Sequence, residues 1–288
     1  MEFTKPIIEI IQKRISHRTY TGLPLEQNLI EKLLFLLKNQ ELISPFSIFA
    51  GKARFKLLRV PEFDPKEKKK LGTYGIIKGA QDFIVGAVEK SPYDREHFGY
   101  LLEKIILIAT DMGLGTCWLG GTFNRSLFSA KINSSQDEII PAITPVGYID
   151  QKSNREKIIR SFAKADKRLP WEVLFFEGNT SNPLNKNKIG EYSKLLEMIR
   201  IGPSAGNKQP WRIIKMRDDN IFHFYTINPK EGRFLKYDKF RPLDIGIAVC
   251  HFDLTAKDLQ LNGHWLFEDP QLLGTEDLLY KISWIEND

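Results

Sequence analysis

The sequence has few cysteines, few histidines and no long apolar run. Its two cysteines, Cys117 and Cys250, are too few for a disulfide framework and form no Cys-x-x-Cys pair. The five histidines show no spacing typical of metal ligands, so we expect no metal site. The longest apolar runs, such as residues 105–109, fall far short of the roughly 18 residues that a membrane-spanning helix requires. We therefore expect no membrane segment.

The start of the sequence also lacks an export signal. Residues 1–6 contain no basic region followed by an apolar stretch of secretory length. Both cysteines are predicted to lie inside apolar helical segments, where a small buried thiol is the usual role. These features fit a reducing compartment, and we expect a cytoplasmic protein.

Basic residues exceed acidic ones by 42 to 36, which gives a formal net charge of +6. A basic surface can neutralise nucleic-acid phosphates. The densest run, residues 66–70, is interrupted by Glu67 and follows Pro65, which is typical of a solvated loop or helix end. No helix-turn-helix, zinc-finger or RNA-binding aromatic pattern accompanies it. We expect no nucleic-acid partner, and a module built on this lysine-rich run remains the weaker alternative.

The chain contains a weak internal repeat. When Trp265 is aligned with Trp118, an offset of 265 − 118 = 147, residues 98–102 coincide with residues 245–249 without a gap. Further matches keep helical spacing, which indicates one type of buried helix used twice. With 42% hydrophobic residues, the chain can bury either one large core or two smaller ones.

Each half is predicted to run helix, strand, strand, long buried helix, strand, so the fold class is α+β. The predicted strands correspond as residues 55–60 with 211–215, 82–88 with 221–226, and 146–149 with 282–285. Residues 177–188 are polar and turn-rich, which is typical of a linker. We therefore predict a first half at residues 1–176, a linker at 177–188, and a second, reduced half at 189–288.

Three polar side chains follow one another at two-residue intervals near the N-terminus. Residues 7–11 form an apolar helical face, and Arg14, Ser16 and Arg18 come next. In an extended segment, this spacing points all three side chains to the same side. Arginine forms paired, charge-assisted hydrogen bonds to phosphate. The pattern therefore predicts an anion site, although Arg-x-Ser-x-Arg alone is also typical of a solvated surface.

A glycine-rich segment, residues 113–121, follows the long helix of the first half. Glycine at a helix end supplies a left-handed cap, so Gly113 or Gly115 is predicted to have this structural role. Gly120 and Gly121 come later, at a strand-like turn where glycine lets the backbone approach a flat ligand closely. The matching residues of the second half, 266–268, contain no glycine. Only the first half therefore retains this feature.

The most specific pattern is Pro-Ser-Ala-Gly-Asn-Lys-Gln-Pro-Trp at residues 203–211. With Arg-x-Ser-x-Arg and the glycine-rich segment, it resembles the nitroreductase family, over nearly the whole chain. Members of that family are usually homodimers whose two motifs contact one flavin from opposite subunits. Here the expected place of the second motif is filled by residues 43–51, a poor match, and the good copy lies in the other half. The resemblance implies two fused half-repeats in a monomer that acts as a pseudo-dimer with one flavin site.

The resemblance also assigns roles within that site. It places the Gly120–Gly121 turn near flavin N5, Lys167 and Arg168 at the phosphate, and Arg18 near N1 and the C2 carbonyl as electrostatic support. Flavin N5 would carry the chemistry, and no catalytic side chain is expected. The cofactor-binding residues that it implies are Arg14, Ser16, Arg18, Gly120, Gly121, Lys167, Arg168, Pro203, Ser204, Ala205 and Asn207.

Two further segments have expected roles. Six basic residues lie between Arg155 and Arg168, and the resemblance favours the last two as phosphate ligands, whereas the earlier ones also fit a basic helix face. In the family, the arm that follows joins the partner's sheet, so residues 173–176 are expected to pair with the sheet of the second half. The turn at residues 78–80 either approaches the flavin or lies on the surface.

The resemblance implies an FMN-dependent oxidoreductase. It would pass a hydride from NADH or NADPH through flavin N5 to a small acceptor, such as a nitroaromatic or a quinone. The main alternative is a flavin-binding protein without reductase activity.

Overall fold

A computed structural model describes residues 3–38, 43–73, 76–150, 167–228 and 237–287. The chain divides into two compact units, Met1–Ala165 and Asp166–Asp288. This division falls ahead of the arm that begins at residue 167, because that arm belongs to the sheet of the second unit. The basic residues 155–164 lie outside the described residues.

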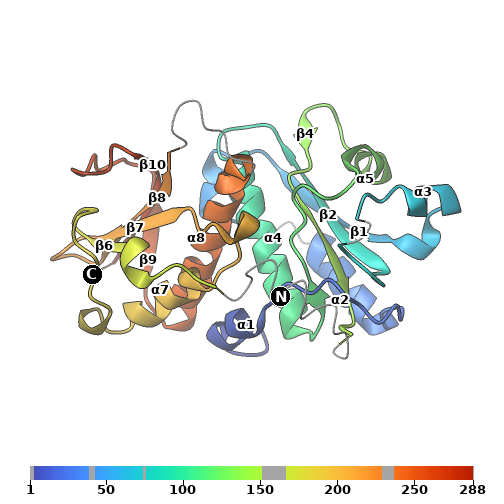
Figure 1. Ribbon diagram of the computed structural model, residues 1–288, viewed down its shortest axis with the longest axis horizontal. Helices are drawn as coiled ribbons and strands as arrows, with labels where there is room; N and C mark the ends of the chain where they lie inside the picture. The colour runs from blue at the N-terminus through green and yellow to red at the C-terminus, as the bar shows by residue number, and fades with distance from the viewer. Residues whose placement is uncertain (1–2, 39–42, 74–75, 151–166, 229–236, 288) are drawn as a thin grey trace. The chain divides into compact units, whose positions relative to one another are not determined.

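The first unit contains an antiparallel sheet with the strand order β1-β2-β5-β3, and β4 beside β2 (Figure 1). Its strands are β1 (Ala53–Arg59), β2 (Asp82–Glu89), β3 (Gly115–Thr116), β4 (Glu138–Ile139) and β5 (Ile143–Gly147). Its helices are α1 (Ile7–Lys13), α2 (Gln27–Lys38), η1 (Pro45–Ile48), η2 (Val60–Glu62), α3 (Pro65–Lys69), α4 (Asp94–Asp111) and α5 (Arg125–Ile132).

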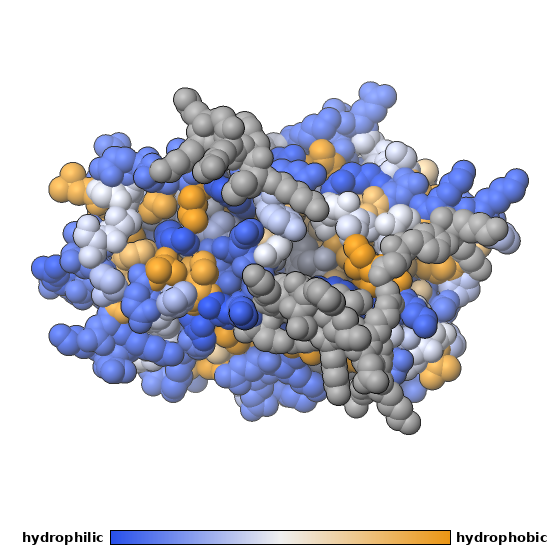
Figure 2. Space-filling view, viewed as in Figure 1, coloured by the Kyte–Doolittle hydropathy of each residue, from blue (hydrophilic) through white to orange (hydrophobic). Residues whose placement is uncertain are grey.

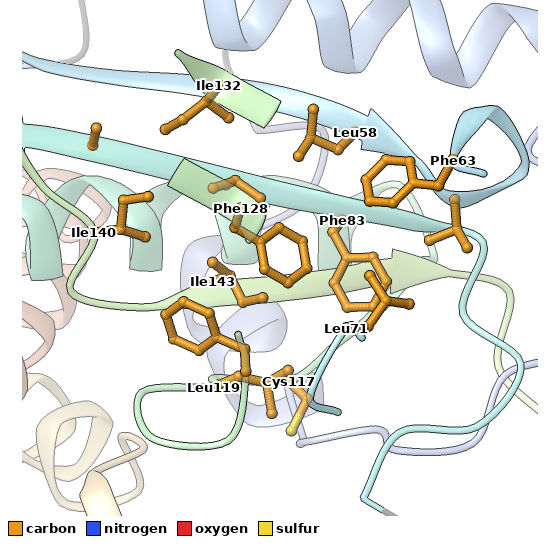
Figure 3. Packing of buried hydrophobic residues seen from close by; sticks show 14 residues of the cluster. Leu58, Phe63, Leu71, Phe83, Cys117, Leu119, Phe128, Ile132, Ile140 and Ile143 are labelled. Carbon is orange, nitrogen blue, oxygen red and sulfur yellow. The ribbon is translucent and has the colours of Figure 1, made fainter. Parts of the chain in front are cut away.

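Strand β2 is buried on both faces, and its alternating side chains meet two different layers. Phe83 points into an apolar cluster with Phe128 of α5 and Ile143 of β5, shown in Figure 3. Gly86 faces the opposite layer, where a Cβ atom would lie 2.6 Å from the Phe98 ring of α4. Helix α4 therefore covers one face of the sheet, and α5 covers the other.

The second unit contains a sheet with the strand order β6-β7-β8-β10-β9. Its strands are β6 (Phe175–Glu177), β7 (Trp211–Lys215), β8 (Ile221–Ile227), β9 (Gly263–Leu266) and β10 (Leu278–Glu286). Its helices are η3 (Trp171–Val173), η4 (Lys186–Lys188), α7 (Tyr192–Arg200), η5 (Ala205–Asn207), η6 (Asp238–Phe240) and α8 (Arg241–Asp258). Strand β6 pairs in parallel with β7, which confirms that the arm joins the second sheet.

Aromatic side chains form the contact between α8 and this sheet. The Phe252 ring of α8 lies 5.2 Å from the rings of Phe224 on β8 and Trp284 on β10, measured between centroids. Edge-to-face pairs of this kind add stabilisation beyond the area that they bury.

The two units repeat one plan, as the sequence predicts. Helix α4 spans residues 94–111, and adding the offset of 147 gives 241–258, which are the bounds of α8. The strand order β1-β2-β5-β3 recurs as β7-β8-β10-β9. Between the last two strands of this order, the first unit inserts α5 and β4, whereas the second has only residues 267–277. The second half is therefore the reduced copy.

The predicted environment of one cysteine is wrong. Cys250 lies buried in α8, but Cys117 follows β3, and its backbone N–H donates to Thr144 Oγ1 at 3.0 Å. Helix α4 ends earlier because Gly113 adopts a φ of +81° and the Leu114 N–H donates to the Ala109 carbonyl. Of the two glycines predicted as possible caps, Gly113 forms the left-handed cap, whereas Gly115 lies in β3. Cys117 then packs in the apolar cluster beside Leu119 (Figure 3).

Hydrophilic side chains dominate the visible surface of each unit, and apolar residues appear there as scattered patches (Figure 2). Within the described ranges, no helix has the length and apolar character needed to cross a bilayer.

Candidate functional site

The N-terminal motif lies beside the strand that leads into the glycine-rich turn. Ser16 forms a parallel bridge with Thr116 of β3, and the His17 N–H donates to the Thr116 carbonyl at 2.8 Å. Four residues further on, the chain reaches Gly120 and Gly121. The structure therefore brings together two elements that are a hundred residues apart in sequence and that were both predicted to bind the cofactor.

The turn at residues 78–80 packs against the same motif. The Lys78 N–H donates to the Arg18 carbonyl, and the Tyr20 N–H donates to the Lys78 carbonyl, both at 2.9 Å. Gly79 has a φ of +78°, and a Cβ atom there would lie 2.3 Å from the Tyr20 carbonyl oxygen. Only glycine allows this approach. The turn supports the motif while the Lys78 residue itself remains exposed.

The three motif side chains differ in their surroundings. Arg14 ends α1 and is buried, with its Nε atom 3.7 Å from Glu103 Oε1 of α4. Ser16 and Arg18 are only half-buried, and Arg18 Nη1 lies 3.5 Å from the Ser16 carbonyl. Ser16 and Arg18 are therefore the motif members more open to a ligand from solution, whereas the charge of Arg14 is balanced inside the protein.

Glu103 is a wholly buried carboxylate that also binds Trp118, in the glycine-rich segment. Trp118 Nε1 donates to Glu103 Oε2 at 2.7 Å. In the second unit, Trp265 Nε1 donates to Asp253 Oδ1 at 3.1 Å, so the bond from tryptophan to helix carboxylate recurs. The carboxylates differ by 253 − 103 = 150 positions, three more than the repeat offset, or about one helical turn. The sequence alignment did not reveal this pairing.

Gly120 and Gly121 form a turn where pairing with β5 ends. Leu119 exchanges two backbone hydrogen bonds with Ile143, at 2.9 and 3.0 Å. The glycines with positive φ in the described ranges include Gly113 but neither Gly120 nor Gly121. Their backbone conformation therefore does not by itself demand glycine.

In the second unit, Lys167 and Arg168 contact the turn at residues 203–211. Arg168 donates to Asn207 Oδ1 at 3.0 Å and to the Ile201 carbonyl at 2.9 Å, and Asn207 Nδ2 donates to the Lys167 carbonyl. The Leu169 N–H donates to Gln209 Oε1 at 3.0 Å. The structure thus joins the predicted phosphate residues to the most specific motif of the sequence.

This turn contains three residues in the left-handed region. The φ angles are +58° at Gly206, +55° at Asn207 and +47° at Gln209. For a residue other than glycine this conformation costs of order 1–3 kcal/mol and persists only where the surroundings enforce it. Here the Gln209 N–H donates to Ser204 Oγ at 2.9 Å, and Gln209 Nε2 donates back to the Asn207 carbonyl.

A buried carboxylate fixes the other side of the turn. Asp244, in the first turn of α8, accepts a hydrogen bond from the Ala205 N–H at 2.9 Å. Burial raises the pKa of this carboxyl well above its usual range, against the opposing effects of the Ala205 bond and Arg241. The ring of Tyr237 packs where a Gly206 Cβ would be, at 2.8 Å, so glycine is required there as well.

The equivalent turn in the first unit keeps its serine but is closed by aromatic rings. His97 occupies the position of Asp244, since 244 − 147 = 97, and its Nδ1 atom lies 2.7 Å from Ser44 Oγ. Ser44 caps η1 as Ser204 precedes η5. Phe46, two residues later, is completely buried and stacks on Tyr93. Residues 43–51, the poor match in sequence, therefore form a turn that is filled by the Phe46 side chain.

Sequence analysis missed the residues that position these turns, namely Glu103 and Asp244. Glu103 interrupts an apolar helical run, and an acidic residue in such a run signals a buried partner. Asp244 resembles an ordinary acidic residue in the first turn of a helix, so no local pattern singles it out.

A family model described as "Putative TM nitroreductase" matches residues 6–256. The chain belongs to this nitroreductase family. A search of curated proteins finds no match to this member of the family.

One solved structure agrees with this assignment at the level of the fold. A "putative nitroreductase" of Thermotoga maritima covers 100% of this chain and 97% of its own, with a TM-score of 0.62 and 20% identity. A nitroreductase family protein of Clostridium difficile covers 59% of this chain and 94% of its own, with a TM-score of 0.40 and 18% identity. A "putative nitroreductase" of Desulfovibrio desulfuricans in complex with FMN covers 52% and 90%, with a TM-score of 0.40 and 20% identity. The first match shows that the whole chain has a nitroreductase-like α+β fold built from two fused half-repeats.

Replacing Glu103 tests the importance of the buried ion pair. Glu103→Ala leaves a buried arginine and a tryptophan N–H without their carboxylate, so we expect the free energy of unfolding to fall by about 3–5 kcal/mol. Asp253→Ala is the matched control in α8. Its partner Lys257 remains largely exposed, so we expect a smaller loss, about 1–2 kcal/mol. Urea unfolding measures both, and equal losses would contradict the special role of Glu103.

Two buried histidines make stability depend on pH. Burial lowers the pKa of His97 and of His223 to about 4. In the unfolded chain a histidine titrates near 6.5, so as pH falls below that value the unfolded state gains protons that the folded state refuses. Stability is therefore complete above pH 6.5 and is lost toward pH 4, by about 1–2 kcal/mol per histidine between pH 7 and pH 5.

Substituting one histidine checks this dependence. His97→Gln removes the titrating group and reduces the loss of unfolding free energy between pH 7 and pH 5. The control is His264→Gln, the same substitution at an exposed histidine. Urea titrations at both pH values decide the matter, and an unaltered dependence in His97→Gln would refute the assignment.

Proposed function

We propose that the protein is an FMN-dependent oxidoreductase that passes a hydride from NADH or NADPH through flavin N5 to a small acceptor, such as a nitroaromatic or a quinone. Membership of the nitroreductase family supports an oxidoreductase. The single observation that carries the proposal is the pairing of Ser16 with Thr116, which sets the arginine motif beside the glycine-rich turn. The resemblance assigns both elements to one cofactor.

The residues of each unit fit the chemistry of a flavin mononucleotide. Its phosphate needs cationic donors, and Lys167 is exposed. The pyrimidine edge of its ring gains negative charge on reduction, and the half-buried Arg18 would stabilise that charge. Its flat ring system needs closely approaching backbone, which Gly120 and Gly121 permit. In the second unit, Pro203, Ser204, Ala205 and Asn207 are all partly exposed at a rigid turn.

In the proposed site, the protein binds and orients while FMN, when bound, supplies the redox chemistry. Arg18 would stabilise negative charge that develops at the pyrimidine edge of the ring. Ser204 would hydrogen-bond that edge or the ribityl chain, and Lys167 would hold the phosphate. Asn207 and Arg168 already bind each other, so they would act together, with Asn207 fixing the turn as well as contacting the cofactor. The glycine turn would present its backbone N–H near N5.

One flavin site built from both halves requires the arginine motif and the turn at residues 203–211 to serve the same cofactor. We therefore propose that the protein is a monomer that acts as a pseudo-dimer, with the two halves of one chain in place of two subunits. The aromatic filling of the turn at Phe46 supports one site per chain, because the duplicate of the serine-asparagine turn is closed by its own ring.

FMN binding to variants of each half tests this arrangement. Arg18→Ala in the first half and Lys167→Ala in the second each remove a charge-assisted hydrogen bond, and we expect each to weaken FMN affinity about 10- to 100-fold. Lys188→Ala, an exposed lysine of the second half outside the site, is the control and keeps wild-type affinity. Fluorescence titration of the apoprotein with FMN gives the dissociation constants.

The possible results separate the alternatives. A loss confined to variants of one half would exclude a shared site. Bound FMN that neither NADH nor NADPH reduces would support a flavin-binding protein without reductase activity. A protein that cannot be loaded with FMN would defeat the proposal, and salt-dependent affinity for nucleic acid would then favour the module built on residues 66–70.

A further inference from the structure

Arg125, the first residue of α5, donates hydrogen bonds to three backbone carbonyls around the glycine turn. Its Nε atom donates to the Ile140 carbonyl at 3.1 Å, and its Nη2 atom donates to the carbonyls of Gly120 and Pro141. The guanidinium carbon lies 4.6 Å from the centre of the Phe123 ring. One planar group thus joins the turn after β3 to the chain that enters β5.

The hydrogen bond from Arg125 to the Gly120 carbonyl fixes the direction of the Gly121 N–H. The peptide bond between Gly120 and Gly121 is trans, as are all those described. In a trans peptide the carbonyl and the following N–H point in opposite directions. Because Arg125 holds the Gly120 carbonyl on its own side, the Gly121 N–H points away from Arg125. Two glycines without side chains would otherwise let this peptide rotate with little resistance.

Stabilisation of α5 does not account for Arg125 at its first position. The positive end of the helix dipole disfavours a cation in the first turn of α5. Asn124 already caps this helix by accepting from the Leu127 N–H at 3.1 Å. Desolvation lowers the pKa of the Arg125 guanidinium, so the contact with the carbonyls is made at some electrostatic cost. The geometry points instead to a role in shaping the turn.

We propose that Arg125 is a positioning residue for the flavin site. By holding the Gly120 carbonyl, it directs the Gly121 N–H toward flavin N5, and so sets the hydrogen bond made to the reacting atom. This inference rests on the proposed function and adds to it a residue that no motif contains. Arg125 touches the turn and acts through it.

The second half lacks both the arginine and the glycine pair. Between β9 and β10 the second half has only residues 267–277, which contain no counterpart of α5 and no arginine. It also lacks the paired glycines at the position of Gly120 and Gly121. The arginine and the glycine pair therefore occur in the same half and are absent from the same half, as expected if one serves the other.

A matched control lies at the other end of α5. Arg54 donates to the carbonyls of Ile132 and Asn133, at 3.0 and 3.1 Å, and pairs with Glu138. It therefore anchors the same helix by the same kind of contact but does not touch the glycine turn. Arg125→Lys keeps the positive charge and loses the three-carbonyl fork, and Arg54→Lys makes the same chemical change away from the turn.

The experiment loads wild-type protein and both variants with FMN labelled with 15N at N5. Hydrogen bonding shifts the N5 resonance, so in Arg125→Lys we expect it to move toward its position in an apolar solvent, where N5 accepts no hydrogen bond. In stopped-flow reduction, the limiting rate is expected to fall about tenfold, because a misdirected donor impairs orientation rather than binding. The apparent dissociation constant for the nicotinamide stays within about twofold of wild type on the same grounds. Arg54→Lys should match the wild type in all three measurements.

An N5 resonance unchanged in Arg125→Lys would overturn the inference, and so would an equal shift in Arg54→Lys, which would indicate general loosening of the α5 segment. Arg125→Gln provides a second comparison, because it removes the positive charge. A shift of the N5 resonance seen only in Arg125→Gln would assign the effect to that charge and not to the hydrogen bonds with three carbonyls. If the wild-type protein binds FMN and Arg125→Lys behaves normally, this inference alone fails. If the wild-type protein binds no FMN, the proposed function fails together with it.

Discussion

The buried carboxylate of Glu103 is the interaction on which the first unit's candidate site depends. A charge without contact to water is stable only where a partner and hydrogen bonds replace its hydration. Arg14 and Trp118 provide these, and they come from the arginine motif and the glycine-rich segment respectively. One side chain of α4 therefore fixes the position of both segments. In the second unit, the same role falls to Asp253, whose lysine partner is largely exposed, so the contact there is less demanding.

The two halves share their framework and differ at its ends. The bounds of α4 and α8 coincide at the offset of 147, and four strands have the same order in the sheet of each unit. The differences lie in the turns, where each half retains what the other has lost. The first keeps the glycine turn with its supporting helix α5, and the second keeps the serine-asparagine turn. Duplication of a framework leaves the turns free to diverge, because packing in the framework does not depend on them.

Periodicity predicted the framework because its cause is local. The continuous apolar run of β2 and the helical spacing in α4 arise from burial of neighbouring residues, so each can be read from a short window. Cys117 was misplaced because apolar residues continue past Asp111, whereas the left-handed Gly113 ends the helix there. The motifs identified the turns for the same local reason. The bonds between Arg168 and Asn207, or between Asp244 and Ala205, join residues 39 positions apart, and no local pattern encodes such pairs.

The contrast between the turn at Ser44 and the turn at Ser204 bears on what the second one is for. Closing the turn with Phe46 buries an aromatic ring, which stabilises the fold without left-handed backbone at that position. The turn at residues 203–211 instead holds Asn207 and Gln209 in a costly conformation and uses buried polar groups, including Asp244, to maintain it. A turn shaped only for packing would adopt the first solution, which this chain demonstrably can form. Strain combined with partly exposed polar atoms is what the proposed flavin-binding role of this turn would require.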